Sequence, residues 1–260
     1  LLTDPAAQPQ KAPADQARGA EGVWGGDVFT RVVASLMLLV FQLFFVLFAL
    51  SAARAVITAP GDIPSWLLSD GESDLHSYSN LLQAVERKSD GAPRFCRKTG
   101  AYKPDRAHYC HEVGRCVLQF QTFSPQLNSA IGFYNYKYFL LFIFWAFWTC
   151  GVAAAVLLPL IVDFFNNGDM GPGGDLASAF MAFVMDLALF LSLLGFQALH
   201  LRLLLQNCMT IEAFEKRNIQ PWPYDKGRRG NFVEVFGHNP WLWAFPVPSG
   251  AATASLASQL

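Results

Sequence analysis

Three long apolar runs dominate the distribution of hydrophobic and polar residues along the chain. Residues 32–53 form a run of 22 residues without a charge, and residues 138–162 form a second run of 25. Residues 176–201 form the third run, in which Asp186 is the single acidic residue. A membrane-spanning helix needs about 20 mostly apolar residues, so each run is long enough to cross a bilayer. We therefore predict an all-α membrane protein with three transmembrane helices, at 28–58, 138–163 and 176–205.

The charged residues between these helices set an expected orientation. Segment 54–137 holds ten Lys and Arg residues and the tail from Arg202 holds six, whereas loop 163–175 holds none. The positive-inside bias then places the domain at 59–137 and the C-terminal region 206–260 on the cytosol-like face, which is the matrix or stroma in an organelle. The short loop 164–175 and an extended polar N-terminal arm, 1–27, belong to the opposite face.

Composition narrows the class of partner. The net charge is −1, with 53% hydrophobic and 15% charged residues, which argues against a nucleic-acid partner because phosphates call for a clustered basic surface. Five cysteines, an odd number, do not suggest a secreted disulfide scaffold. The N-terminal arm has little to bury and would be ordered only where neighbouring proteins pack against it, which favours other membrane-protein subunits as partners. Leu at position 1 is expected to reflect a removed leader or an unseen start.

From Cys96 the chain reads CRKTGAYKPDRAHYCHEVGRCVLQFQTFSPQLNSAIGFYNYKYF. This segment resembles the cysteine-rich domain of the Asp-His-His-Cys (DHHC) protein S-palmitoyltransferases, whose pattern is C-x2-C-x3-[RK]-P-x-R-x2-H-C-x2-C-x2-C-x4-D-H-H-C-P-W-x-N-x-C-[IV]-G-x2-N-x3-F. Twelve positions match in one register over 44 residues: Cys96, Lys103, Pro104, Arg106, Cys110, Cys116, Pro125, Asn128, Ile131, Gly132, Asn135 and Phe139.

Other landmarks of that family follow in order. The stretch TAPGDIP at 58–64 resembles its D-P-G motif, NCMTIEAFEKRN at 207–218 resembles its T-T-x-E motif, and YDKGRRGNFVEVFGHNPWLWAFPV at 224–247 resembles its C-terminal motif. The resemblance implies a tepee-like helix bundle over a cytosolic cysteine-rich domain; family members usually have one span more. The positions expected to retain the fold are Pro104, Arg106, Asn128, Gly132, Asn135, Thr210, Glu212 and Asn231.

The family's catalytic motif is replaced. The resemblance implies a Cys that carries the acyl group, a His that acts as base and an Asp that orients it. Gln121, Thr122, Phe123 and Ser124 stand at the four motif positions. A Ser hydroxyl is barely ionised near neutral pH, and a Thr cannot remove its proton. The motif therefore predicts a pseudoenzyme without catalytic residues.

The family's two zinc sites, each built by three Cys and one His, are also altered. By register the first site becomes Cys96, Thr99, Tyr109 and Cys116, and the second becomes Cys110, Val113, Phe123 and Ala130. We predict no zinc, and an apolar plug of Val113, Phe123 and Ala130 in place of the second site. The alternative is one rearranged zinc held by ligand-type residues that remain: Cys96, His108, Cys110, His111 and Cys116.

Three further features of the sequence have more than one possible role. Asp186 in the third span is an intramembrane functional candidate by default, although a polar contact with Asn, Thr or Trp groups or with a partner subunit is preferred. His200 lies near a helix end, where a snorkelling or interfacial role is expected. The basic run KGRRG at 226–230 is either a solvated turn or a contact for anionic lipid head groups.

These features favour a structural accessory subunit of a large membrane complex, such as a respiratory complex or ATP synthase of the mitochondrial inner membrane. No cofactor is expected, but the bundle cavity that holds an acyl chain in the family could retain a structural lipid. Two alternatives stay open. One is a protein S-acyltransferase with unusual chemistry that uses Cys110 or Cys116 as acyl carrier; the other is a regulatory partner of active palmitoyltransferases in the Golgi or plasma membrane.

Overall fold

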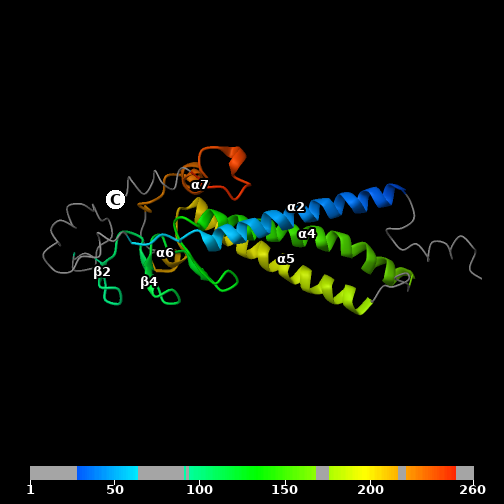
Figure 1. The fold of residues 1–260 in the computed structure, drawn as a ribbon, viewed down its shortest axis with the longest axis horizontal. Helices are drawn as coiled ribbons and strands as arrows, with labels where there is room; N and C mark the ends of the chain where they lie inside the picture. Colours follow the sequence, from blue (N-terminus) through cyan, green and yellow to red (C-terminus); the bar gives the residue numbers. More distant parts are fainter. Residues whose placement is uncertain (1–27, 64–90, 92–93, 168–175, 216–220, 250–260) are drawn as a thin grey trace, which may run out of the picture. The chain divides into compact units, whose positions relative to one another are not determined.

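The computed structural model describes residues 28–63, 91, 94–167, 176–215 and 221–249 (Figure 1). The predicted arm 1–27 and most of the predicted loop 164–175 lie outside these residues. The chain divides into two compact units. The first joins the described part of Leu1–Phe45 to Phe147–Ser192, and the second joins Val46–Ala146 to Leu193–Leu260. Each unit is described by itself.

Among the described residues, three helices are long and apolar enough to cross a membrane, as the three predicted spans require. They are α2 (Val28–Ile57), α4 (Tyr136–Asn167) and α5 (Leu176–Leu205). The mean hydropathy of their most apolar windows is 2.7, 2.2 and 2.2. Most large side chains of α2 and α5 are exposed, as expected for helices whose solvent is lipid, whereas many of those in the first turns of α4 are buried.

The first unit is built from segments of these helices. The rings of Phe147 and Phe190 stack with centroids 4.5 Å apart, and Gly151 leaves room for Phe190, whose Cε2 would lie 3.1 Å from a Cβ there. An apolar cavity of about 480 Å³ opens between α2 and α4. Its lining is Ala34, Met37, Leu38 and Phe41 from α2 with Ala153, Val156 and Leu157 from α4.

The second unit contains three two-stranded antiparallel hairpins. They pair β1 (Phe95–Cys96) with β2 (Ala101–Tyr102), β3 (His108–Cys110) with β4 (Arg115–Val117), and β5 (Thr122–Ser124) with β6 (Ser129–Ile131). The prediction of an all-α protein is therefore wrong for this domain, and the chain is mostly helical. Strands of two or three residues are too short to leave a periodic pattern in the sequence.

Asn135 connects the hairpins to two of the long helices. Its Oδ1 accepts a hydrogen bond from Gly132 N at 2.8 Å, and its Nδ2 donates to Ala55 O at 3.0 Å and Ala130 O at 2.9 Å. Gly132 has no room for a side chain, because a Cβ would lie 2.5 Å from Val117 Cγ1 and 2.6 Å from a backbone oxygen. These contacts explain physically why both residues match the family pattern.

The C-terminal region adds α6 (Thr210–Glu215), α7 (Arg228–Phe236) and the 3₁₀ helix η3 (Pro240–Leu242). Asn231 in α7 is 1% exposed and fixes this region to the end of α5. Its Nδ2 donates to Leu205 O at 2.8 Å and to Asp225 Oδ1 at 2.7 Å, and its Oδ1 accepts from Lys226 N at 2.9 Å. Because both the oxygen and the nitrogen of the Asn231 side-chain amide are hydrogen-bonded, α7 is held in one position relative to the end of α5.

Candidate functional site

A buried ion pair joins the cysteine-rich domain to α6. Arg106 donates to both carboxylate oxygens of Glu212, at 3.0 and 2.9 Å, and the two side chains are 3% and 0% exposed. Arg106 also donates to the side chain and the carbonyl of Asn207, and its guanidinium lies 4.6 Å from the ring centroid of Tyr224. Glu212 further accepts from Met209 N at 2.8 Å. A buried pair with such bidentate geometry is stable only because its remaining donors and acceptors are also matched.

Thr210 at the start of α6 holds the motif strand. Its hydroxyl donates to the backbone carbonyl of Gln121, next to β5. The hairpin itself pairs Thr122 with Ile131 and Ser124 with Ser129. The sequence predicted that Thr210 and Glu212 are fold-retaining positions. In the structure both lie on α6, where Glu212 binds Arg106 and Thr210 binds the backbone of Gln121.

The hydroxyl groups at the motif positions make only local hydrogen bonds among the described residues. Ser124 is 5% exposed; its hydroxyl donates to Gln126 Oε1 and accepts from Leu127 N, both at 3.4 Å. The Thr122 hydroxyl donates to Phe123 O at 3.3 Å. Neither hydroxyl is hydrogen-bonded to an imidazole among the described residues. The arrangement therefore provides no activated nucleophile at position 124.

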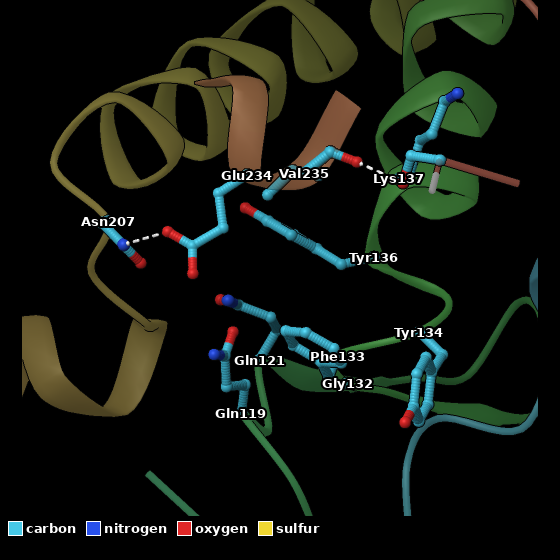
Figure 2. Close-up of a pocket in the computed structure, with 11 residues that line it drawn as sticks. Gln119, Gln121, Gly132, Phe133, Tyr134, Tyr136, Lys137, Asn207, Glu234 and Val235 are labelled. Atoms are coloured by element: carbon cyan, nitrogen blue, oxygen red, sulfur yellow. Dashed lines mark hydrogen bonds between the residues drawn. The ribbon is translucent and has the colours of Figure 1, made fainter. Parts of the chain in front are cut away.

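A small polar cavity lies beside Gln121 (Figure 2). Gln121 is 6% exposed, and its Oε1 and the Nε2 of Gln119 are buried without a hydrogen-bond partner in the described part of the chain. Both side chains point toward Glu234 of α7, and the ring of Tyr136 lies beside them. The cavity measures about 30 Å³, which is room for a water molecule or two and far too little for a lipid chain.

Tyr136 reaches from this cavity to a buried histidine. Its hydroxyl lies 3.4 Å from His200 Nδ1, and His200 is 1% exposed. The imidazole packs edge-on against Phe139 and Phe196, with centroids 5.3 and 4.6 Å away. The prediction of an interfacial, snorkelling His200 is wrong, because the aromatic rings of α4 and α5 enclose it.

The thiols of the cysteine-rich domain are buried and differ in acidity. Burial raises the pKa of Cys110 and of Cys116, the latter to about 11. Burial also opposes ionisation of Cys96, but hydrogen bonds from the Thr99 side chain and backbone outweigh it and lower the pKa to about 7. Cys110 and Cys116, which are 1% and 4% exposed, are therefore poor nucleophiles.

The donor sets do not fit the zinc sites that the family implies. In the first set, Thr99 and Tyr109 offer hydroxyls beside two thiols, and Thr99 Oγ1 lies 3.8 Å from Cys116 Sγ. At the second, an apolar cluster of Cys110, Val117 and Ala130 is covered by Phe120 and Phe123. Among described residues, no three His, Cys, Asp or Glu side chains converge as ligands would, including the pair His108 and His111.

The predicted plug is correct for Phe123 and Ala130 and wrong for Val113, which is 36% exposed at the β3–β4 turn. Val117 of β4 takes its place because strand pairing turns that residue inward.

Asp186 lies in the first unit, where its side chain is hydrogen-bonded to Cys150 of α4. The expected partners were Asn, Thr or Trp, so the structure replaces them with a thiol. Its Oδ2 is buried without a hydrogen-bond partner among the described residues. A polar contact between Asp186 and a partner subunit stays a prediction.

Comparison with known proteins identifies the family of the chain. Residues 89–217 match the family model of the DHHC palmitoyltransferases. The chain is 38% identical over 223 residues to the "Probable protein S-acyltransferase 14" of Arabidopsis thaliana, covering 83% of this chain and 73% of the relative. It belongs to the DHHC palmitoyltransferase family. It is also 36% identical to "Probable protein S-acyltransferase 13" of Arabidopsis thaliana over 83% and 73% of the two chains, and 30% identical to human "Palmitoyltransferase ZDHHC20" over 81% and 62%.

These relatives correct two expectations drawn from the altered motif. The chain was expected to be a structural accessory subunit and not an enzyme, yet the proteins that it resembles over most of its length are named as acyltransferases. The DHHC family is confirmed, and so is a membrane protein with spanning helices. The mitochondrial location gains no support from these relatives.

Sequence reasoning missed several residues at this site. Gln119, Tyr136 and Asn207 line the cavity, and Lys137 at the start of α4 is 4% exposed. Of these, Asn207 had a signal, because it begins the T-T-x-E-like stretch. Gln119, Tyr136 and Lys137 belong to no sequence motif that would have identified them. Their place at the site depends on the packing of the C-terminal region against α4.

Proposed function

We propose that this chain is a membrane protein S-acyltransferase, which transfers a fatty acyl group from an acyl-coenzyme A thioester to a cysteine of a protein at the membrane. The similarity to named S-acyltransferases over four fifths of the chain carries the proposal. The intact connection from Arg106 through Glu212 and Thr210 to position 121 supports it, because that connection holds the family's reaction site in place. We propose the Golgi or plasma membrane as its location, because members of the DHHC family usually lie there.

The altered motif requires a different chemical route. Among the described residues no base is hydrogen-bonded to Ser124, Cys110 and Cys116 are buried thiols with raised pKa values, and Cys96, whose pKa is lowered to about 7, is only 4% exposed. None of the four is therefore suited to carry the acyl group. We therefore favour direct transfer, without an acyl-enzyme. The acceptor protein's own cysteine is the nucleophile in this route.

Direct transfer balances without a cofactor. The acceptor thiol loses a proton to the medium, and its thiolate attacks the thioester carbonyl carbon. A new carbon–sulfur bond forms, the bond to coenzyme A breaks, and the coenzyme A thiolate takes up a proton. A cysteine is already a few per cent thiolate at pH 7, so positioning donor and acceptor supplies the rate enhancement that a strong base would otherwise provide.

The apolar cavity between α2 and α4 suits a lipid chain. Its volume of about 480 Å³ lies within the range of small-molecule sites, and every lining residue is apolar. We assign it to the tail of the acyl donor or to a bound lipid. Replacing Ala153 by Phe would narrow it, whereas Leu158→Phe adds the same ring to an exposed position of α4 and serves as the matched control.

The test uses the purified full-length chain in phosphatidylcholine vesicles, with palmitoyl-coenzyme A and a cysteine peptide that carries a lipid anchor. We expect hydroxylamine-sensitive palmitate on the peptide, formed faster than without protein. Ala153→Phe should slow it and Leu158→Phe should not. No transfer above the uncatalysed rate would refute the function. An acylated intermediate on the chain that passes palmitate to the peptide would refute only the direct route.

A further inference from the structure

The last described segment of the chain is held along a spanning helix. Lys137 Nζ donates to Leu242 O and to Val247 O, both at 3.0 Å. Trp145 Nε1 donates to Ala244 O at 3.1 Å. Residues 240–247, called here the C-terminal loop, therefore follow the first turns of α4, and all of these contacts lie within the second unit.

These anchors set the depth of the loop. Lys137 and Trp145 are eight residues apart in one helix, which is about 12 Å along its axis. Long side chains on a helix lean toward its N-terminus, so Trp145 meets the loop at a level shallower than its own Cα. The helix α4 is long and apolar enough to span a membrane as Tyr136–Asn166, so the loop lies beside the first turns of a candidate membrane span.

The outward side chains of the loop are large and apolar. Trp241 is 85% exposed, Phe245 49% and Leu242 40%, and residues 240–247 (PWLWAFPV) include no charge. Trp243 points inward: it packs on Phe232 with centroids 4.8 Å apart and donates to Gly237 O. Exposed aromatic residues without inward packing mark a surface that contacts something other than water.

Most of the backbone N–H groups of the loop are hydrogen-bonded within the chain, which lowers the cost of placing irregular backbone at membrane depth. The amide groups of Trp241, Leu242, Trp243, Phe245 and Val247 all donate to acceptors between residues 239 and 245. Three of the carbonyls accept from the side chains of α4 described above, and the two prolines have no N–H to satisfy.

We propose that the C-terminal loop inserts into the bilayer, at the boundary between head groups and acyl chains of the leaflet where α4 begins. Trp241, Leu242 and Phe245 contact lipid there, and Lys137 fixes the loop to the helix. Interfacial segments bury their apolar face by roughly 5–10 Å, which agrees with anchors in the first turns of α4. Tryptophan is enriched at this level because its ring is apolar and its N–H is polar. The inference is independent of catalysis.

The test measures lipid contact at Trp241 in the purified full-length chain, reconstituted in phosphatidylcholine vesicles with bromine on the acyl chains. Subtracting the fluorescence of Trp241→Phe from that of the wild type isolates the emission of Trp241. We expect that emission to be blue-shifted and to lose most of its intensity, more with bromine near the head group than with bromine near the chain end.

Trp222→Phe provides the matched control. The Trp222 indole donates to Asn207 O at 2.9 Å beside the buried ion pair, so its emission should be unaffected by bromine. A red-shifted, unquenched Trp241 in vesicles that contain only this chain would overturn the proposal and would point to a protein partner on the loop. Circular dichroism of each variant verifies that the helices remain folded.

Discussion

The second unit contains two polar regions that differ in how completely their groups are paired. The Arg106 guanidinium makes four hydrogen bonds, to both carboxylate oxygens of Glu212 and to the side chain and carbonyl of Asn207, and it lies over the ring of Tyr224. Around Gln121 two amide atoms are buried without a hydrogen-bond partner among the described residues, and the hydroxyl of Ser124 is hydrogen-bonded there within its own hairpin turn. The first region fixes the fold, so its residues are strongly interdependent. The second tolerates change, because removing a hydroxyl there leaves no buried charge.

The largest expected effect concerns the paired region. Arg106→Ala leaves the carboxylate of Glu212 buried without its cation, which costs about 3–5 kcal/mol when one partner of a buried pair is removed. Unfolding of the purified chain in detergent by guanidinium measures it. Arg115→Ala is the control, because its bridge to Asp62 is nearly half exposed and should contribute less than about 1 kcal/mol. Equal losses of unfolding free energy in the two variants would contradict the expected difference between the buried and the exposed ion pair.

A smaller effect is expected in the apolar cluster that stands at the second metal position. Phe123→Ala removes a ring that covers Cys110, Val117 and Ala130, and because the ring is half-buried we expect a loss of about 2 kcal/mol. Val113→Ala, at an exposed turn, should change stability by no more than about 0.5 kcal/mol. If a zinc chelator destabilised the wild type as much as Phe123→Ala does, the apolar cluster would not be the stabilising element.

The acidity of Cys96 gives a third prediction, on pH. Its folded pKa of about 7 lies below the ordinary value of 9.0 for a cysteine, so the folded chain gains one thiolate as pH rises through 7. By linkage this ionisation adds stability between pH 7 and 9, and the contribution is lost as pH falls back through 7. Absorbance at the thiolate band should rise with a midpoint near 7 in the wild type and not in Cys96→Ser. Thr99→Val should move the midpoint upward; an unmoved midpoint would exclude the Thr99 hydrogen bond as the cause.

The smallest effect is expected at the position of the family's nucleophile. Ser124→Ala removes a hydroxyl whose two hydrogen bonds are long, at 3.4 Å, so stability should change by about 0.5–1 kcal/mol at most. If acyl transfer is direct, as proposed, the rate of peptide palmitoylation should stay at the wild-type value. A complete loss of transfer with unchanged folding would instead make Ser124 the acyl carrier.

The sequence by itself determined the three spans and the family, because an apolar run and a spaced motif are local properties of the chain. It also identified Arg106, Asn135, Thr210 and Glu212 as one retained set, although it could not say that Arg106 would meet Glu212. Reading the altered motif as the loss of all enzymatic function was wrong, since four residues cannot represent a similarity that extends over most of the chain.

Only the tertiary structure decided the rest. Val117 lies in the apolar cluster where Val113 was predicted, and His200 lies among aromatic rings and not at the membrane interface. Lys137 and Trp145 donate to carbonyls about a hundred residues away in the sequence. Each of these outcomes depends on which surfaces meet when hairpins and helices pack, and on which carbonyls the C-terminal loop presents. Such contacts leave no periodic trace in the sequence, because hydrophobic periodicity reports the face of an element and not its partner.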